Sequence, residues 1–472
     1  MEKKKLLKYL VNPGDIRFWI LVFFLVRLVG ITNPPLEIAH SWRMVTTNMY
    51  ARNFLEIDNN ILYARVDMAG ELSGITAKEF PLYNYLIYLV SLVFGWHHWY
   101  GRLISLLVSS LGTWYFYLLI RRFYGERHAF FSTLVLMLSL WFAYSRKIMP
   151  DTFSMSLVLA GFYYGICYLY SGKGYRLTLY LLLGTAGTLS KIPSSYMFVL
   201  FLLPLFDRGV LIRRKAWLLA ASAILIAVNG IWYLYWVPEV TGTYGFIHYP
   251  EKSFVEGTRE VFRNFGDFLK RFYHSALMSY VSLAVFLAGL VLLFIRKEKR
   301  VLVSFGLLLA TFLVFTLKAG RSFTWHNYYI IPFVPAMAMV AGYLLSEIRR
   351  KWLYISLLLV IAAEGVANQQ HEFFVPGRER YKLDLEVMAD SVCGKDDLVA
   401  VSGGHNPQQL YFMHRRGWAL NDEEIDEPDE VREFRERGAG YLFINKRSAI
   451  GEFEQYPVVY EDDFYRVYSL LD

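Results

Sequence analysis

Charged side chains collect at four places where this chain leaves its long apolar runs, and acids and bases occur together there. The four segments carry Glu37, His40, Arg43, Arg52 and Glu79 in 33–100, Arg146, Lys147 and Asp151 in SRKIMPD, Lys191 in GTLSKIPSS, and Lys318, Arg321 and His326 in KAGRSFTWHNYY. Carboxylates of this kind can act as general bases. Arg and Lys are the side chains that hold phosphates. The pattern predicts a site for an anionic headgroup or phosphate with a base beside it.

Each of these residues also has a simpler interpretation. Arg and Lys at the end of a membrane span often extend their charged ends to the headgroups. Asp151 follows Pro150 and could cap the next helix, and His326 could be an interfacial hydrogen-bonding residue. HHW at 97–99 favours headgroup anchoring over a metal site, because adjacent histidines on a helix do not face one ion. The sequence leaves these alternatives open.

Apolar runs must position the charged segments. The chain has 472 residues, of which 55% are hydrophobic and 18% aromatic. About eleven runs have the composition of membrane spans, although some are shorter than the roughly 20 residues that a bilayer needs. They are 16–32, 103–120, 129–145, 152–170, 177–189, 195–206, 216–236, 276–295, 301–317, 328–345 and 353–367. The sequence therefore predicts a polytopic α-helical membrane protein, and its net charge of +8 reflects basic turns, not nucleic-acid binding.

The basic clusters fix a predicted orientation. If 81–97 lies flat at the interface, every cluster falls on the cytoplasmic side, as the positive-inside rule requires. These clusters are Lys3–Lys5, Arg121–Arg122, Lys173–Arg176, Arg208–Lys215, Arg296–Arg300 and Arg349–Lys351. The N-terminus is then cytoplasmic, and 33–100, 237–275 and the C-terminal segment are extracytoplasmic. The protein is expected in the cytoplasmic (plasma) membrane.

The last hundred residues have a different composition. DLVAVSG and GAGYLFI are typical of strands, whereas NPQQLYFMHR and EPDEVREFRERG are typical of short helices. This alternation predicts a small extracytoplasmic α/β domain at 369–472, after a transmembrane domain at 1–368. Two cysteines and no zinc spacing argue against a disulfide framework or a zinc site.

The motifs together resemble a known family. HSWRMVTTNMYARNF, LYARVDMAGELSG and KEFPLYNYL in the first loop, then SRKIMPD, TLSKIP and HNYYIIPFVPAMA, are similar in kind and order to the dolichyl-phosphate-mannose protein mannosyltransferase-like family (glycosyltransferase family 39). Its bacterial relatives include the lipid A aminoarabinose transferase. HRRGW at 414–418 resembles a C-terminal element of some bacterial members. The resemblance covers most of the membrane part.

The resemblance implies a GT-C fold with its active site at the outer membrane face. It also implies a polyprenyl-phosphate sugar donor and inversion at the anomeric carbon. The family's loop acids correspond to Glu37, Asp67 and Glu79, and its later acid to Asp151. Lys191 falls where the family places a cation on the donor phosphate. His326 and Tyr329 fall where it places residues near the headgroup.

Two departures from the family leave its catalytic base open. The family carries an Asp-Glu pair early in the first loop, where this chain has Glu37 followed by HSWR. Phe80 stands where aminoarabinose transferases have a lysine, which argues against aminoarabinose as the sugar. We expect Glu37 or Asp67 as base, with Asp151 next, and Glu79 holding the loop or the acceptor. The expected substrate-binding residues are His40, Arg43, Arg52, Arg146, Lys191, His326 and Tyr329.

The predicted function is a membrane hexosyl- or pentosyltransferase acting on a lipid, glycan or protein acceptor outside the cytoplasm. No cofactor is required when cations flank a leaving monophosphate, although the sequence leaves a divalent metal open. The alternatives are a polyprenyl-linked lipid transporter or flippase, and a non-catalytic component of an envelope complex. A transporter is expected to show internal repeats and charges at the bilayer midplane, whereas this chain shows no repeat and places its charges at one face.

Overall fold

The chain folds into two compact units. The computed structural model describes residues 12–37, 39–246, 252–425, 428–448 and 453–471. The helical unit comprises Met1–Ile31, Gly101–Tyr233 and Pro250–Phe373, and the mixed unit comprises Thr32–Tyr100, Leu234–Tyr249 and Phe374–Asp472. The first loop therefore belongs to the same unit as the C-terminal residues, which the predicted division at 368/369 did not anticipate.

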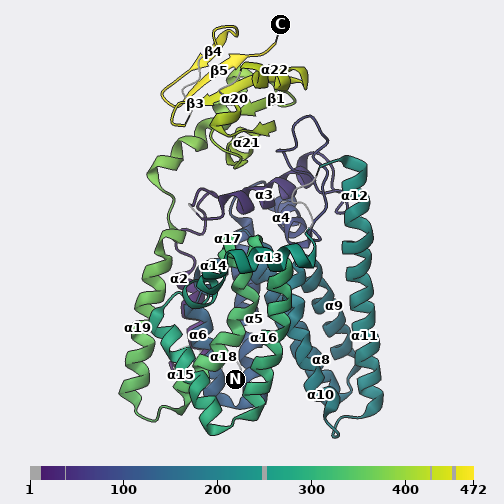
Figure 1. The fold of residues 1–472 in the computed structure, drawn as a ribbon, viewed down its shortest axis with the longest axis vertical. Helices are drawn as coiled ribbons and strands as arrows, with labels where there is room; N and C mark the ends of the chain where they lie inside the picture. The colour runs from purple at the N-terminus through teal and green to yellow at the C-terminus, as the bar shows by residue number, and fades with distance from the viewer. Residues whose placement is uncertain (1–11, 38, 247–251, 426–427, 449–452, 472) are drawn as a thin grey trace. The chain divides into compact units, whose positions relative to one another are not determined.

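The helical unit is built almost entirely from α-helices (Figure 1). Its helices are α2 (Ile16–Val26), α5 (Tyr100–Tyr124), α6 (Glu126–Leu138), α7 (Trp141–Tyr144), α8 (Pro150–Ser171), α9 (Gly174–Ser190), α10 (Leu202–Phe206), α11 (Ile212–Gly230), α13 (Phe254–Arg263), α14 (Phe265–Lys270), α15 (Tyr280–Arg296), α16 (Lys299–Ala319), α17 (Arg321–Trp325), α18 (Val334–Glu347) and α19 (Lys351–Gln369). The 3₁₀-helices η1 (Ile192–Phe201), η4 (Asn327–Phe333) and η5 (Gln370–Phe373) and the π-helices η2 (Ile231–Trp236) and η3 (Arg271–Ser275) join them.

The described chain contains six helices that are long and apolar enough to cross a membrane, or seven if one bent pair is counted as a span. The six are Tyr100–Tyr124, Pro150–Ser171, Ile212–Tyr244, Lys299–Ala319, Asn327–Glu347 and Lys351–Val392. The chain is thus a multi-pass membrane protein. The predicted runs near 16–32 and 195–206 form shorter helices, and the run at 129–145 breaks between α6 and α7. Of the roughly eleven predicted spans, six or seven are supported by helices of sufficient length in the described chain.

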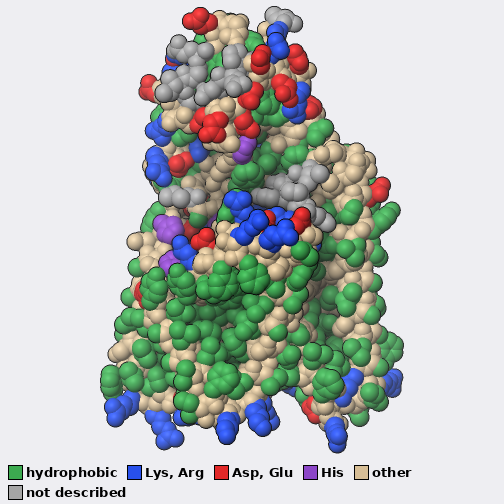
Figure 2. Space-filling view, in the orientation of Figure 1, with side chains coloured by type: hydrophobic (Ala, Val, Ile, Leu, Met, Phe, Trp, Pro, Cys, Tyr) green, Lys and Arg blue, Asp and Glu red, His purple; other side chains and the backbone are tan. Residues whose placement is uncertain are grey.

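Basic residues gather at one end of the helical unit. The turns between α10 and α11, α15 and α16, and α18 and α19 lie at the same end (Figure 1). The predicted clusters Arg208–Lys215, Arg296–Arg300 and Arg349–Lys351 lie in these turns and in the helix ends beside them. Figure 2 shows Lys and Arg there, below a surface of hydrophobic side chains. The predicted cluster Lys3–Lys5 lies outside the described residues.

Small residues let these helices approach closely, as in other membrane bundles. Gly342 of α18 packs on α6, where an added Cβ would lie 2.4 Å from the Ser132 Cα and backbone N. In the same way, a Cβ on Gly161 of α8 would lie 2.8 Å from the backbone N of Gly184 in α9. Because the obstructing atoms are backbone, they cannot move aside like a flexible side chain.

Gly342→Ala should therefore destabilise the helical unit. We expect the overpacked contact to cost about 1–3 kcal/mol and to lower the thermal transition of the detergent-solubilised protein. Gly306→Ala is the matched control, because Gly306 lies within α16 with open space around it. That substitution should be neutral or stabilising by up to about 1 kcal/mol. Equal transitions for the two variants would show that α6 and α18 do not pack this closely.

The mixed unit contains a five-stranded sheet with the order β2-β1-β3-β5-β4. Its strands are β1 (Leu398–Val401), β2 (Arg416–Ala419), β3 (Ala439–Asn445), β4 (Val458–Glu461) and β5 (Tyr465–Ser469). β1 pairs in parallel with β2 and β3, and the last two strands pair antiparallel. The helices α20 (Leu385–Val392), α21 (Gln408–Met413) and α22 (Pro428–Glu436) connect to these strands. The predicted strands DLVAVSG and GAGYLFI and both predicted helices are present.

The first loop covers one face of this sheet. Alternate residues of a strand point to opposite faces, and in β1 Val399 and Val401 join a core that includes Val45 and Met49 of α3 (Ser41–Glu56). Ala400 joins the core on the other face, beside α22. A hydrophobic cluster formed by the first loop and the C-terminal residues therefore holds the mixed unit together.

The same unit contains α4 (Leu82–Phe94), which forms most of the segment expected to lie flat in the membrane interface. Thirteen residues extend about 20 Å, which is less than the roughly 30 Å hydrocarbon core. One face is buried through Tyr83, Ile87 and Tyr88, whereas Val93 and Phe94 are exposed. The helix is too short to cross, and its interfacial position stays a prediction.

Candidate active site

The helical unit brings Asp151 and Lys191 together. Asp151 lies in the first turn of α8 and Lys191 at the C-terminal end of α9, with 3.5 Å between the Asp151 Oδ1 and the Lys191 Nζ. Both side chains are buried. The N-cap of α8 is Met149 without a side-chain capping bond, so Asp151 faces the lysine instead of capping the helix. Two residues predicted from separate motifs form one ion pair.

Local packing explains where Lys191 lies. The Ser154 Oγ of α8 donates to the carbonyl oxygens of Gly187 and Lys191 at 2.7 and 3.2 Å. A Cβ on Gly187 would lie 2.8 Å from Val158, so only glycine allows α9 to approach α8 here. The carbonyl groups of Gly187 and Lys191 are thereby bonded to α8, which fixes the backbone at Lys191.

Aromatic rings surround the Lys191 ammonium group. Its Nζ lies 5.5 Å from the ring centroid of Tyr328 and 5.3 Å from that of Tyr329. His326 stacks on Tyr328 with centroids 5.2 Å apart. Rings at these distances attract a cation without neutralising its charge. The predicted residues His326 and Tyr329 thus lie in the same cluster as Lys191.

A second part of the cluster lies between α7 and α8. The Lys147 Nζ is 2.5 Å from the Glu372 Oε2 of η5, and the Arg146 guanidinium lies over the Phe373 ring at 4.3 Å. The Tyr144 hydroxyl donates to the Asn327 Oδ1 at 2.6 Å and so links α7 to η4, which carries Tyr328 and Tyr329. Arg146, Lys147 and Lys191 therefore belong to one connected group.

Sequence reasoning did not single out three buried charged residues of the helical unit. Arg27, just after α2, donates to the Ser145 Oγ and is fully buried, as is Arg102 of α5. A useful signal for Arg27 was present, since an ionisable residue inside an apolar run is by default a functional candidate. Glu372 gave no such signal, because it lies in a polar stretch far in sequence from its partner Lys147.

The buried charges of the helical unit are mainly positive. Among its described residues, five buried cations stand against two buried acids. The cations are Arg27, Arg102, Arg146, Lys147 and Lys191, and the acids are Asp151 and Glu372. Burying charge of one sign in a membrane protein is costly unless it serves a ligand or pathway. This excess of buried positive charge favours the binding of an anion.

The mixed unit holds the remaining predicted residues. The Arg43 NH2 lies 2.8 Å from the Glu79 Oε1, which ties α3 to the segment before α4. His40 precedes α3 with φ 62°, in the left-handed region that few non-glycine residues adopt, and Glu37 is buried. Arg43 and Glu79 are brought together as a pair.

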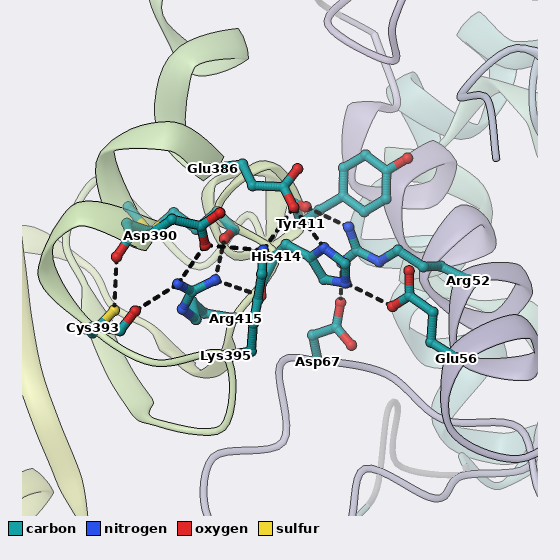
Figure 3. A network of polar contacts seen from close by, with 12 residues as sticks. Arg52, Glu56, Asp67, Glu386, Asp390, Cys393, Lys395, Tyr411, His414 and Arg415 are labelled. Carbon is teal, nitrogen blue, oxygen red and sulfur yellow. Dashed lines mark hydrogen bonds and ion pairs between the residues drawn. The ribbon is translucent and has the colours of Figure 1, made fainter.

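Asp67 makes contacts typical of a structural carboxylate. Its Oδ2 accepts from the Arg52 NH2 at 2.8 Å, and its Oδ1 accepts from the Asn53 Nδ2 at 2.8 Å (Figure 3). Arg52 also donates to the Tyr411 carbonyl at 3.0 Å. With both carboxylate oxygens engaged, Asp67 is poorly suited to accept a proton from a substrate.

The described residues contain no group of three or more His, Cys, Asp or Glu side chains that could hold a metal ion. In the helical unit, Asp151 and Glu372 each face a lysine instead of each other. The part of the chain that the structure describes thus offers no such donor set for a divalent cation.

Part of this chain is similar to proteins of a known family. Residues 78–233 match the family described as dolichyl-phosphate-mannose-protein mannosyltransferase. This segment includes α8, α9, Asp151 and Lys191. About a third of the chain is thus similar to these mannosyltransferases. A comparison with curated proteins gives no match.

Solved structures of other membrane-protein families share the fold of this chain. ArnT from Cupriavidus metallidurans in the apo state is similar with a TM-score of 0.62 and 14% identity, over 96% of this chain and 98% of that chain. Its structure bound to undecaprenyl phosphate gives 0.59 and 13% over the same shares. An Archaeoglobus fulgidus oligosaccharyltransferase tethered with an acceptor peptide gives 0.51 and 11%, over 91% of this chain and 69% of that chain. At these identities the likeness establishes the fold.

Proposed function

We propose that this protein transfers a sugar from a polyprenyl-phosphate donor to an extracytoplasmic acceptor with inversion at the anomeric carbon. The observation that carries the proposal is the excess of buried cations, Lys191 among them, in the helical unit. A polyprenyl phosphate combines an apolar tail with an anionic headgroup, which matches a cationic site within a membrane bundle. The similar ArnT structure with bound undecaprenyl phosphate supports this class of ligand.

In the proposed reaction an acceptor hydroxyl oxygen attacks the anomeric carbon. A new glycosidic bond forms while the bond from that carbon to the phosphate oxygen breaks, and its electron pair stays on the leaving phosphate. The hydroxyl proton passes to a carboxylate, for which Glu37 is our first candidate. Lys191 would stabilise the charge that develops on the phosphate, with Arg146 and His326 in support.

The surrounding residues then have defined roles. Asp151 orients the Lys191 ammonium group, and the rings of Tyr328 and Tyr329 lie beside it. Glu79 and Arg43 keep the start of α3 next to the segment before α4. The N-terminus and the basic turns are cytoplasmic in this proposal, and the sugar acceptor is a lipid, glycan or protein outside.

The proposal is tested by following donor turnover. The purified protein in lipid is incubated with radiolabelled polyprenyl-phosphate sugars and membrane acceptors, and release of polyprenyl phosphate is measured. We expect release from one donor class together with a labelled acceptor. Movement of intact donor across sealed vesicles without release would instead support a flippase, and neither release nor movement by folded protein would leave a non-catalytic envelope component.

A further inference from the structure

The C-terminal part of the mixed unit forms hydrogen bonds to the first loop on both sides of Glu37. The Gln408 Nε2 donates to the carbonyl oxygen of Pro35 at 2.9 Å, and the Asn406 Nδ2 donates to the Ser41 Oγ at 2.9 Å. Pro35 and Ser41 flank the segment that contains Glu37. Two amide side chains, from Asn406 in the loop after β1 and from Gln408 at the start of α21, thus hold this segment at both ends.

Further hydrogen bonds fix the orientation of the Asn406 and Gln408 side chains. The Gln408 Oε1 accepts from the Lys382 Nζ at 2.6 Å, which leaves its amide nitrogen directed at Pro35. The Asn406 Oδ1 accepts from the Gln408 backbone N at 3.2 Å. The neighbouring Gln409 donates to the Ser402 carbonyl at 2.6 Å, which closes the loop onto β1. Gln408 is 4% exposed, so water does not compete readily for its bonds.

The far end of α3 is held by the same part of the chain. His414 lies between two carboxylates, with its Nε2 2.7 Å from the Glu56 Oε2 at the end of α3 and its Nδ1 2.9 Å from the Glu386 Oε1 of α20 (Figure 3). Arg52 reaches the Tyr411 carbonyl one turn earlier in α3. The C-terminal residues therefore fix both the start and the end of the helix.

We propose that Asn406 and Gln408 are positioning residues, through which the C-terminal domain sets the geometry of the Glu37 segment for sugar transfer. This inference rests on the proposed function for its catalytic consequence. A carboxylate that accepts a proton must lie within hydrogen-bond reach of the acceptor hydroxyl, and small displacements are costly to such a step. The C-terminal domain thereby acts on the rate of reaction without contacting the substrate itself.

The two amides allow a matched pair of substitutions. Gln408→Glu keeps an acceptor for Lys382 but loses the donor, and the Pro35 carbonyl cannot donate in return. Asn406→Asp keeps an acceptor for the Gln408 backbone N, and the Ser41 hydroxyl can reverse direction and donate to it. The two variants add the same charge at nearby positions, yet only the first loses its bond to the Glu37 segment.

The test measures steady-state transfer kinetics and amide hydrogen exchange of residues 39–47 in the full-length protein. For Gln408→Glu we expect kcat to fall about tenfold with the donor KM unchanged, and exchange to rise about 2- to 10-fold, as for loss of one hydrogen bond. Asn406→Asp should match the wild type in both. Asn406→Ala should change both measurements in the same direction as Gln408→Glu. It replaces Gln408→Glu in the test if the Gln408→Glu protein does not fold.

Unchanged exchange and kcat in Gln408→Glu would overturn the proposal. An equal fall of kcat in Asn406→Asp would also overturn it, since the added charge would then explain both results. Raised exchange with unchanged kcat would also overturn it, by leaving a structural role only. If the wild type turns over no donor, the proposed function fails, whereas the exchange data still decide whether these amides hold the segment.

Discussion

Replacing Lys191 with alanine should lower the rate of sugar transfer by about 30- to 1,000-fold. Electrostatic contacts to developing charge in a site that excludes water are typically worth about 2–4 kcal/mol. Lys191 has the features of such a contact, because it is buried, paired with Asp151 and surrounded by the rings of Tyr328 and Tyr329. The measurement is release of polyprenyl phosphate under saturating donor, compared with the wild type.

Two controls separate catalysis from folding in this experiment. Lys191→Ala leaves Asp151 buried beside an apolar side chain, so the double variant Lys191→Ala with Asp151→Asn removes that charge as well. It should regain thermal stability without regaining activity. Lys173→Ala, at an exposed lysine before α9, should leave both unchanged. Full transfer by Lys191→Ala and by Asp151→Asn would exclude this pair from the active site.

Replacing Asp67 with alanine should destabilise the mixed unit by about 3–5 kcal/mol. Breaking a buried ion pair leaves its partner charged and without compensation, which is the costly case. Arg52 and Asp67 are 4% and 5% exposed at their side chains, and Asp67 also accepts from Asn53. Loss of protease resistance in the C-terminal region, or a lower thermal transition, would report the change.

Asp58→Ala provides the comparison for Asp67. Asp58 lies 3.7 Å from Arg65, and its side chain is 40% exposed. Exposed pairs of this kind contribute about 0–1 kcal/mol, so the variant should remain as stable as the wild type. An Asp67→Ala protein with unchanged stability and no transfer activity would reverse our interpretation and make Asp67 the catalytic base.

Composition and charge placement sufficed to predict the membrane fold and the small α/β domain. Local patterns carry that information: apolar runs mark α5, α8, α16 and α18, and short apolar segments that alternate along the chain with helical ones mark β1 and β3. The number of spans was harder to predict, since an apolar run such as 129–145 is divided between α6 and α7 by a turn that apolarity does not reveal. Hydropathy does not distinguish a broken helix from a continuous one.

The candidate site was predicted in part. Motif order placed Asp151, Lys191, His326 and Tyr329 in one function, and the structure brings them into one cluster. The pairing of Lys147 with Glu372, and the amides that flank Glu37, depend on residues hundreds of positions apart. No periodicity or spacing in a single sequence encodes such contacts, because they follow from tertiary packing.

The shared core of the mixed unit also has a consequence for how the protein is made. Asn48 donates to the Tyr411 hydroxyl across 363 residues of chain, and Val45 and Met49 pack against residues of β1. At a synthesis rate of about 5–20 residues per second, α3 emerges on the order of 20–70 s before its partners. During that interval its apolar side chains lack their native neighbours. The first loop is thus a nascent segment that waits for its partners, and a ribosome that stops before β1 leaves these apolar side chains without them.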